Sequence, residues 1–167
     1  MKLLKNQVDK IRHIVFVCTG NVCRSPMAEY LCRHFLAGDP LWQVSSAGVF
    51  ALPGAPASLE AVDALREMSV DLSPHRSRSL SRELIDSATM IVVMTQAHAD
   101  EIKLRFPDVQ DRVHTLKAFD KNATERDIQD PIGGSLETYR LTRDEIESAL
   151  LGLLAYLKSS YRRDGKR

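Results

Sequence analysis

The chain has 167 residues, which is enough to bury a core as a single domain without disulfides or a structural metal. Its composition, 44% apolar and 27% charged, is that of an ordinary soluble globular protein. The formal net charge of +1 excludes a strong overall field that would attract nucleic acid or an anionic membrane surface, so we expect neither as a partner.

The composition of the two ends predicts no targeting or anchoring segment. Residues 1–12 mix charged and apolar groups, lack the apolar region and cleavage site of a signal peptide, and are expected to form an N-terminal extension. No apolar run approaches the ~20 residues that a membrane span needs. The basic residues 161–167 are expected to form a solvated tail. These features predict a cytoplasmic location.

Predicted strands and helices alternate along the chain. Short runs rich in Val, Ile, Thr or Met predict four strands, at 13–17, 43–46, 90–94 and 113–116. Helical patterns follow Ser25 and Pro26 (as N-cap and first-turn residue), span 57–68, run from a cap at Thr95 to Pro107, and begin again at Ser135. The segments 50–56 and 117–134 are expected to be long loops. This order predicts the α/β class: a single-domain three-layer doubly wound sandwich with a four-stranded parallel sheet.

The segment between the first predicted strand and the first predicted helix carries the strongest functional signal. Ligands of such folds bind where strand ends meet helix starts, and residues 18–25, called the phosphate loop below, occupy that junction. Backbone N–H groups converge there, and the helix dipole adds roughly half a positive charge. Gly20 is expected to permit the backbone angles that turn these groups inward. The residues expected to hold an anion are Thr19, Gly20, Asn21, Val22, Cys23, Arg24 and Ser25.

Three side chains of the phosphate loop indicate a phosphoryl-transfer reaction. Arg24 can grip two oxygens of a tetrahedral dianion with its planar fork, which lysine cannot do. The same positive surroundings favour the thiolate of Cys18, which beside a bound phosphate is a nucleophile aimed at phosphorus. Ser25 can donate a hydrogen bond to that sulfur. Each residue alone also fits an ordinary turn with a buried cysteine, but the pattern at this junction favours a functional site.

The cysteines do not indicate a disulfide framework or a metal site. The chain has three, Cys18, Cys23 and Cys32, all in one short stretch. Their odd number does not fit a secreted disulfide-rich protein, and they lack the paired spacing of a zinc site. Neither a metal nor another cofactor is expected, because Arg24 and the backbone supply the positive charge that a phosphoryl group needs.

The stretch VFVCTGNVCRSPMAE resembles the signature of the low-molecular-weight protein tyrosine phosphatase family. The resemblance continues through SSAG at 45–48, HRSRSL at 75–80 and DPIGG at 130–134, and predicts a phosphatase domain over 13–160. It implies that a phosphorylated protein is the substrate and that the phosphate loop also binds inorganic phosphate or sulfate. It further implies that Cys18 is the nucleophile, that Arg24 binds phosphate, and that Asn21, Ser46 and His75 support the loop.

The reaction also needs a general acid to protonate the leaving group. Asp130 precedes Pro131 in a long predicted loop, and this pairing restricts the backbone and so the direction of the carboxylate. Asp127 competes with it on position alone. The resemblance selects Asp130, because in the family the late Asp-Pro pair carries the acid.

The sequence gives opposing signals about the phosphorylated residue. Many tyrosine-directed members place aromatic residues after Asp-Pro, whereas this chain has Ile132 and is similar there to the bacterial protein arginine phosphatases of the family. Those enzymes carry threonine at the position of Val22. Because valine would leave a guanidinium donor unpaired, at about 1–3 kcal/mol, phosphotyrosine is slightly favoured. Phe50 is a candidate for the missing aromatic wall, beside Val22 and Ile132, and equally a loop residue packed on the core.

Two further hypotheses stay open at this point. A non-catalytic phosphoprotein-binding module would keep the phosphate loop, but the presence of Asp130 speaks against it. The resemblance also implies a reversible disulfide between Cys18 and Cys23 that protects the thiolate from over-oxidation. Simple packing explains Cys23 equally well.

Overall fold

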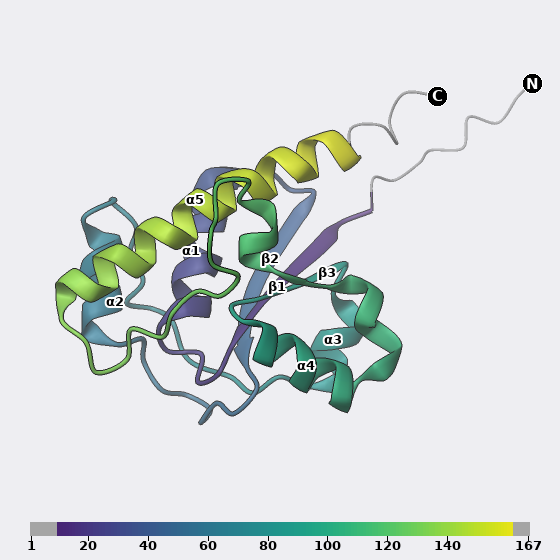
Figure 1. The fold of residues 1–167 in the computed structure, drawn as a ribbon, viewed down its shortest axis with the longest axis horizontal. Coiled ribbons are helices and arrows are strands. Elements are labelled where there is room, and N and C mark those ends of the chain that lie inside the picture. The colour runs from purple at the N-terminus through teal and green to yellow at the C-terminus, as the bar shows by residue number, and fades with distance from the viewer. Residues whose placement is uncertain (1–9, 162–167) are drawn as a thin grey trace, which may run out of the picture.

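The computed structural model describes residues 10–161 and contains one parallel sheet with helices on both faces (Figure 1). The strands are β1 (Arg12–Cys18), β2 (Trp42–Gly48), β3 (Met90–Val93) and β4 (Val113–Thr115). Their order across the sheet is β2-β1-β3-β4, and all neighbours are parallel. The chain therefore winds outward in both directions from β1, which makes the end of β1 a topological switch point. The predicted three-layer doubly wound fold is confirmed.

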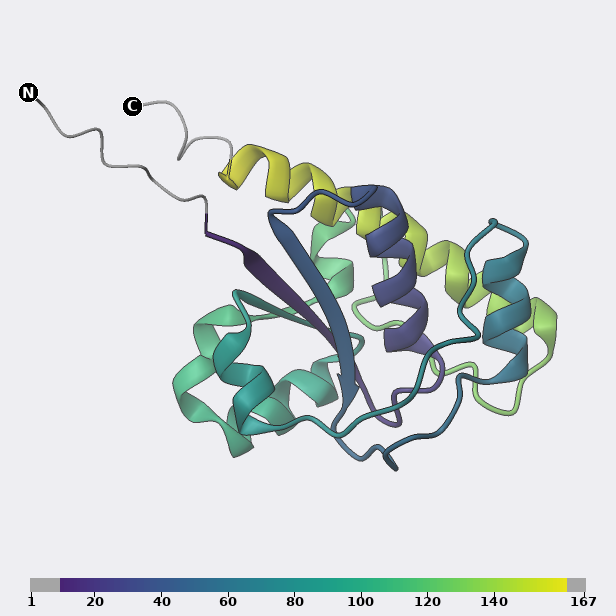
Figure 2. The ribbon, with the colours of Figure 1, turned by 180° about the vertical axis from the view of Figure 1, so that it is seen from behind.

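The helices form two groups, one on each face of the sheet (Figures 1 and 2). Their bounds are α1 (Arg24–Leu36), α2 (Leu59–Arg66), α3 (Arg82–Ser87), α4 (Gln96–Arg105) and α5 (Leu136–Tyr161), with short 3-10 helices η1 (Pro107–Arg112) and η2 (Leu116–Phe119). Within residues 10–161, no helix combines the length and the apolar character needed to cross a membrane.

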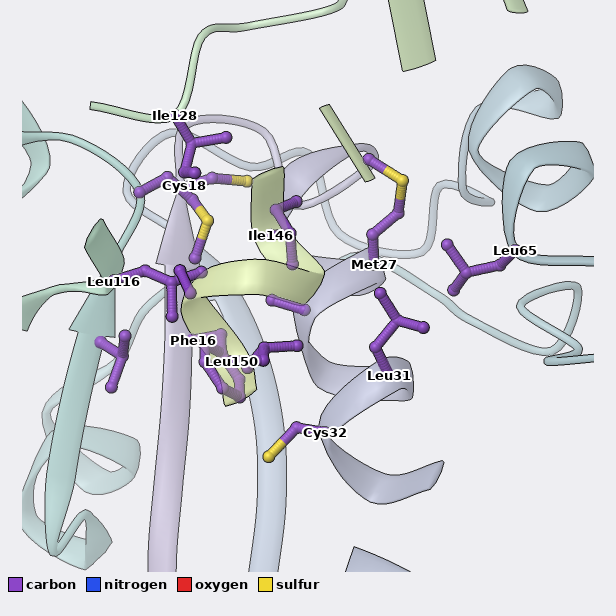
Figure 3. Close-up of a cluster of buried hydrophobic side chains, with 14 of the residues drawn as sticks. Phe16, Cys18, Met27, Leu31, Cys32, Leu65, Leu116, Ile128, Ile146 and Leu150 are labelled. Atoms are coloured by element: carbon purple, nitrogen blue, oxygen red, sulfur yellow. The ribbon is translucent and has the colours of Figure 1, made fainter. Parts of the chain in front are cut away.

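Alternate residues of β1 supply the two hydrophobic cores. Ile14 and Phe16 point to the core shared with α1, α2 and α5, whereas Val15 and Val17 point to the core beneath α3 and α4. The first core contains Met27, Leu31, Leu65, Ile146 and Leu150, and Figure 3 shows these side chains together with Phe16. Because β1 is buried on both faces, its carboxyl end is held rigidly in the middle of the molecule.

The element boundaries differ from the sequence-based prediction in ways that have local causes. Ser25 does not cap the first helix: α1 begins at Arg24, its N-cap residue is Cys23, and no side chain caps it. Helix α3 was not predicted, because its six residues are too few to show a helical period. Thr95 does cap α4 by accepting a hydrogen bond from the His98 N–H at 3.2 Å.

The predicted terminal segments lie largely outside the described residues. Residues 1–9 of the predicted extension and 162–167 of the predicted tail are not described. Within the described residues, β1 begins at Arg12 and α5 extends to Tyr161, one residue beyond each of the predicted bounds of 13 and 160.

Candidate active site

The phosphate loop connects β1 to α1 and forms the floor of a pocket of about 250 Å³. The lining residues are Cys18, Thr19, Gly20, Val22, Cys23, Arg24, Asp130 and Ile132. The pocket thus brings the predicted nucleophile, phosphate ligand and general acid together, although the acid comes from a distant part of the sequence.

The sulfur of Cys18 lies 2.9 Å from the hydroxyl oxygen of Ser25, and both residues are buried. The Ser25 oxygen also accepts a hydrogen bond from the side-chain amide of Asn21 at 2.9 Å. The Ser25 proton can be donated to the sulfur at 2.9 Å, and the alternative acceptor, the Ala47 carbonyl oxygen, is farther away at 3.4 Å. This contact explains why Ser25 does not serve as the helix cap: its side chain points to Cys18 instead.

Asn21, and not Gly20, adopts the left-handed backbone conformation in the phosphate loop. Its φ is 56°, whereas Gly20 is not among the residues with positive φ, so the predicted role of Gly20 is wrong. Asparagine tolerates this conformation better than most residues, and here its side chain is fixed on both sides. Its amide nitrogen donates to Ser25 and to Ser46, the latter at 2.8 Å, and its carbonyl oxygen accepts from the Arg78 backbone N–H at 3.0 Å.

A second layer of polar residues holds Asn21 and Ser46. The Nε2 of His75 lies 2.8 Å from the backbone carbonyl oxygen of Asn21, which must be the acceptor. Burial lowers the pKa of His75, which favours its neutral form. Ser46 donates a short hydrogen bond to Glu29, whose other oxygen lies 2.5 Å from the Arg33 guanidinium. Glu29 was missed by the sequence analysis, although its spacing of four residues from Arg33 on the same helix was a usable signal.

The end of β2 lies directly against the phosphate loop. The backbone N–H groups of Val49 and Phe50 donate to the carbonyl oxygens of Cys18 and Thr19, at 3.0 and 2.9 Å. A Cβ atom at Gly48 would lie 2.5 Å from the Thr19 carbonyl oxygen, so only glycine permits this approach. The shape of the loop thus depends on β2 as well as on its own residues.

Asp130 and Arg24 form an ion pair across the pocket, with 3.1 Å between Oδ2 and Nη2. The Arg24 side chain is 5% exposed and also donates to the Ile128 carbonyl oxygen at 3.0 Å, whereas that of Asp130 is 44% exposed. Asp127, the competing candidate, instead accepts a hydrogen bond from the Gln96 backbone N–H at 2.8 Å and so fixes the start of α4. Asp130 is the aspartate that lines the pocket.

The three candidate wall residues have different positions. Val22 and Ile132 line the pocket. Phe50 does not line the pocket and is 66% exposed. The Arg105 guanidinium stacks over its ring, 4.8 Å from the ring centre. Phe50 is therefore not packed on the core and lies outside the pocket lining, and its role as an aromatic wall stays a prediction.

The thiol of Cys23 points away from solvent into a polar contact with α5. Its sulfur lies 3.2 Å from the hydroxyl oxygen of Tyr139 and 3.5 Å from that of Ser58. Burial raises the pKa of the Cys23 thiol and also that of Tyr139. Cys18, Cys23 and Cys32 are all free, and the disulfide between Cys18 and Cys23 stays a prediction.

His98 is a further residue near the pocket that the sequence analysis missed. It lies in the first turn of α4 and its Nε2 is 2.8 Å from the hydroxyl oxygen of Thr19. Burial, followed by the positive charge of Arg24, lowers the pKa of His98 to about 4. No local motif marks this histidine, because its partner is far away in the sequence.

Comparison with known proteins identifies the family. The family described as low molecular weight phosphotyrosine protein phosphatase matches residues 13–163. A protein-arginine-phosphatase of Geobacillus stearothermophilus is 47% identical over 137 residues, which cover 82% of this chain and 90% of that protein. A probable low molecular weight protein-tyrosine-phosphatase, EpsP of Ralstonia solanacearum, is 40% identical over 121 residues, covering 72% and 79%.

The fold agrees with these matches. The solved structure of the YwlE arginine phosphatase from Geobacillus stearothermophilus superposes with a TM-score of 0.84 at 43% identity, covering 91% of this chain and 96% of that one. With its cysteine-containing phosphate loop at the end of β1, the chain belongs to the low molecular weight phosphotyrosine protein phosphatase family and is a protein phosphatase.

Proposed function

We propose that this phosphatase hydrolyses phosphoarginine side chains of proteins. The observation that carries the proposal is the wall of the pocket, whose lining residues include no aromatic side chain to sandwich a phenol ring. Phe50, the candidate for such a ring, lies outside that lining. The similarity to a named arginine phosphatase supports the same substrate class. This proposal replaces the slight preference for phosphotyrosine predicted from the sequence.

In the first step, the Cys18 sulfur attacks phosphorus. The S–P bond forms and the P–N bond of phosphoarginine breaks, and its electron pair stays on the departing nitrogen. The phosphorylated guanidinium becomes neutral when it takes this electron pair, and Asp130 gives its proton to that nitrogen, so arginine leaves as its guanidinium cation. Arg24 and the backbone N–H groups of the phosphate loop stabilise the charge on the phosphoryl oxygens.

In the second step, water hydrolyses the cysteinyl phosphate. Asp130, now ionised, accepts a proton from the water while the O–P bond forms and the S–P bond breaks. Ser25, at 2.9 Å from the sulfur, donates a hydrogen bond that stabilises the departing thiolate. The products are inorganic phosphate, bound first in the phosphate loop, and the free enzyme. A cytoplasmic location belongs to the same proposal.

The test compares two peptides of identical sequence, one with phosphoarginine and one with phosphotyrosine at the same position. We expect a higher kcat/KM for the phosphoarginine peptide and no turnover of either peptide by Cys18→Ser. Faster hydrolysis of the phosphotyrosine peptide would show that the substrate assignment is wrong, while leaving the cysteine-dependent reaction intact.

Hydrolysis of phosphotyrosine is the second candidate function, and Val22 is the observation that favours it. Val22 lines the pocket and offers only apolar contact, which suits a phenol ring better than a guanidinium group. The same pair of peptides separates the two candidates.

A further inference from the structure

His98 links the start of α4 to the phosphate loop through two threonine hydroxyl groups. Its Nε2 lies 2.8 Å from the Thr19 oxygen, and its Nδ1 lies 3.0 Å from the Thr95 oxygen. The residue is 6% exposed. A buried histidine with both ring nitrogens in hydrogen bonds has a fixed ring orientation, so it can also fix the side chain of Thr19.

The contacts of Thr95 favour one direction for the two hydrogen bonds. Its oxygen already accepts a hydrogen bond from the His98 backbone N–H at 3.2 Å, and its own proton can be donated to Nδ1 of His98. In that tautomer Nε2 carries the ring proton and donates to the Thr19 oxygen. Burial, which lowers the pKa of His98 to about 4, agrees with a neutral ring near neutral pH.

Thr19 is placed to use this arrangement on a substrate. It directly follows Cys18, lines the pocket and is exposed. Arg24 and Asp130 line the same pocket as Thr19. After accepting from His98, the Thr19 oxygen still has one lone pair and one proton available.

We propose that His98 is a positioning residue that acts through Thr19, whose fixed hydroxyl group accepts a hydrogen bond from the guanidinium of phosphoarginine. The inference rests on the proposed function. A phosphoguanidinium presents N–H donors that must find acceptors in the pocket, and Val22 offers none. A phosphorylated phenol has no such donors, so the hydroxyl of Thr19 favours phosphoarginine.

The start of α4 also anchors the loop that carries Asp130, and the test must separate the two effects. The Ile128 N–H donates to the Met94 carbonyl oxygen at 2.9 Å, and Asp127 accepts from the Gln96 N–H at 2.8 Å. A change at His98 that moved this loop would slow every substrate, whereas loss of the contact with Thr19 slows only substrates with N–H donors.

The experiment measures kcat/KM on the phosphoarginine peptide and on p-nitrophenyl phosphate, which has no N–H donor. Thr19→Val and His98→Leu are expected to lower the ratio of the first value to the second by about tenfold or more, because only the phosphoarginine peptide loses a hydrogen-bond acceptor. Thr19→Ser keeps the hydroxyl group, and His98→Gln keeps an N–H donor. Both variants should therefore retain most of the activity on the phosphoarginine peptide. The double variant His98→Leu/Thr19→Val should be no worse than Thr19→Val alone.

Matched controls keep the result interpretable. His114→Leu changes a half-buried histidine on β4 whose ring contacts Phe119 of η2. Thermal unfolding of every variant reports loss of the fold. Equal losses on both substrates, or losses that multiply in the double variant, would overturn the inference. An unchanged kcat/KM of Thr19→Val on the phosphoarginine peptide would also overturn the inference, but it would leave the proposed function standing. If the wild type did not hydrolyse the phosphoarginine peptide, both the inference and the proposed function would be overturned.

Discussion

The guanidinium of Arg24 lies 3.1 Å from the carboxylate of Asp130, so the predicted phosphate ligand and the predicted general acid are paired with each other in the pocket. The guanidinium is buried, and its second interaction is with the Ile128 carbonyl oxygen. A bound phosphate must therefore compete with Asp130 for Arg24. The pair fixes the position of both groups in the pocket.

The substitution Asp130→Asn is expected to separate the two roles of this carboxylate. Loss of the proton donor should lower kcat on the phosphoarginine peptide by roughly 10²–10⁴-fold. Removal of the competing negative charge should at the same time tighten the inhibition by inorganic phosphate. Steady-state rates and phosphate inhibition constants measure the two effects.

Asp127→Asn is the matched control for this prediction. Asp127 accepts a hydrogen bond from the Gln96 N–H at the start of α4. Its substitution should therefore lower the free energy of unfolding while kcat stays close to that of the wild type. A large loss of kcat in Asp127→Asn together with a small one in Asp130→Asn would reverse the assignment of the acid.

Gly48 and Gly20 are expected to respond differently to alanine. A Cβ atom at Gly48 would lie 2.5 Å from the Thr19 carbonyl oxygen and 2.8 Å from the Ala51 Cβ, so either β2 or the phosphate loop must move. At Gly20 the nearest atom is the Val22 Cγ2 at 3.8 Å, which is an ordinary contact. Urea unfolding should show a loss of about 1–3 kcal/mol for Gly48→Ala and of less than about 1 kcal/mol for Gly20→Ala. Equal losses would mean that the contact between β2 and the loop is not tight.

The family signature could be recognised from the sequence because its residues are neighbours along the chain. Cys18 and Arg24 lie in one short loop between a clear strand and a clear helix, and the structure places both in the pocket. Asp130 could be selected over Asp127 only through the resemblance, since their hydrogen-bond partners, Arg24 and the Gln96 N–H, are set by tertiary folding.

The errors of the sequence-based prediction also come from tertiary contacts. Ser25 has the sequence context of a helix cap, but Cys18 and Asn21 offer it stronger partners. Gly20 was the natural candidate for positive φ, yet three side-chain hydrogen bonds stabilise that conformation at Asn21 instead. His98 was missed for the same reason, because its role depends on a contact with the phosphate loop.

The burial of His98 predicts a loss of stability in mild acid. Its pKa is lowered from 6.5 to about 4 in the folded protein, so the unfolded chain binds the proton more readily. This part of the stability is complete above pH ~6.5 and is lost progressively as the pH falls toward ~4. The pKa values of His13, His75 and His114 are also lowered, chiefly by burial, and add to the same trend.

The variant His98→Gln should therefore show a weaker dependence of the free energy of unfolding on pH between about 6.5 and 4, by on the order of 1–3 kcal/mol over the range. Urea unfolding at several pH values measures it, with wild type in the same buffers as reference. Parallel curves for the two proteins would contradict the lowered pKa of His98.

The substitution Val22→Thr tests how far the pocket wall sets the substrate. Val22 lines the pocket without a polar group, so a threonine there adds a second acceptor for a guanidinium beside the hydroxyl of Thr19. The ratio of kcat/KM for phosphoarginine over phosphotyrosine peptide should rise by roughly tenfold. Val22→Ile, which keeps the wall apolar, should leave the ratio near that of the wild type. A ratio that does not change in Val22→Thr would mean that this side chain does not contact the group that distinguishes the two substrates, and that Thr19 and Ile132 set the preference without it.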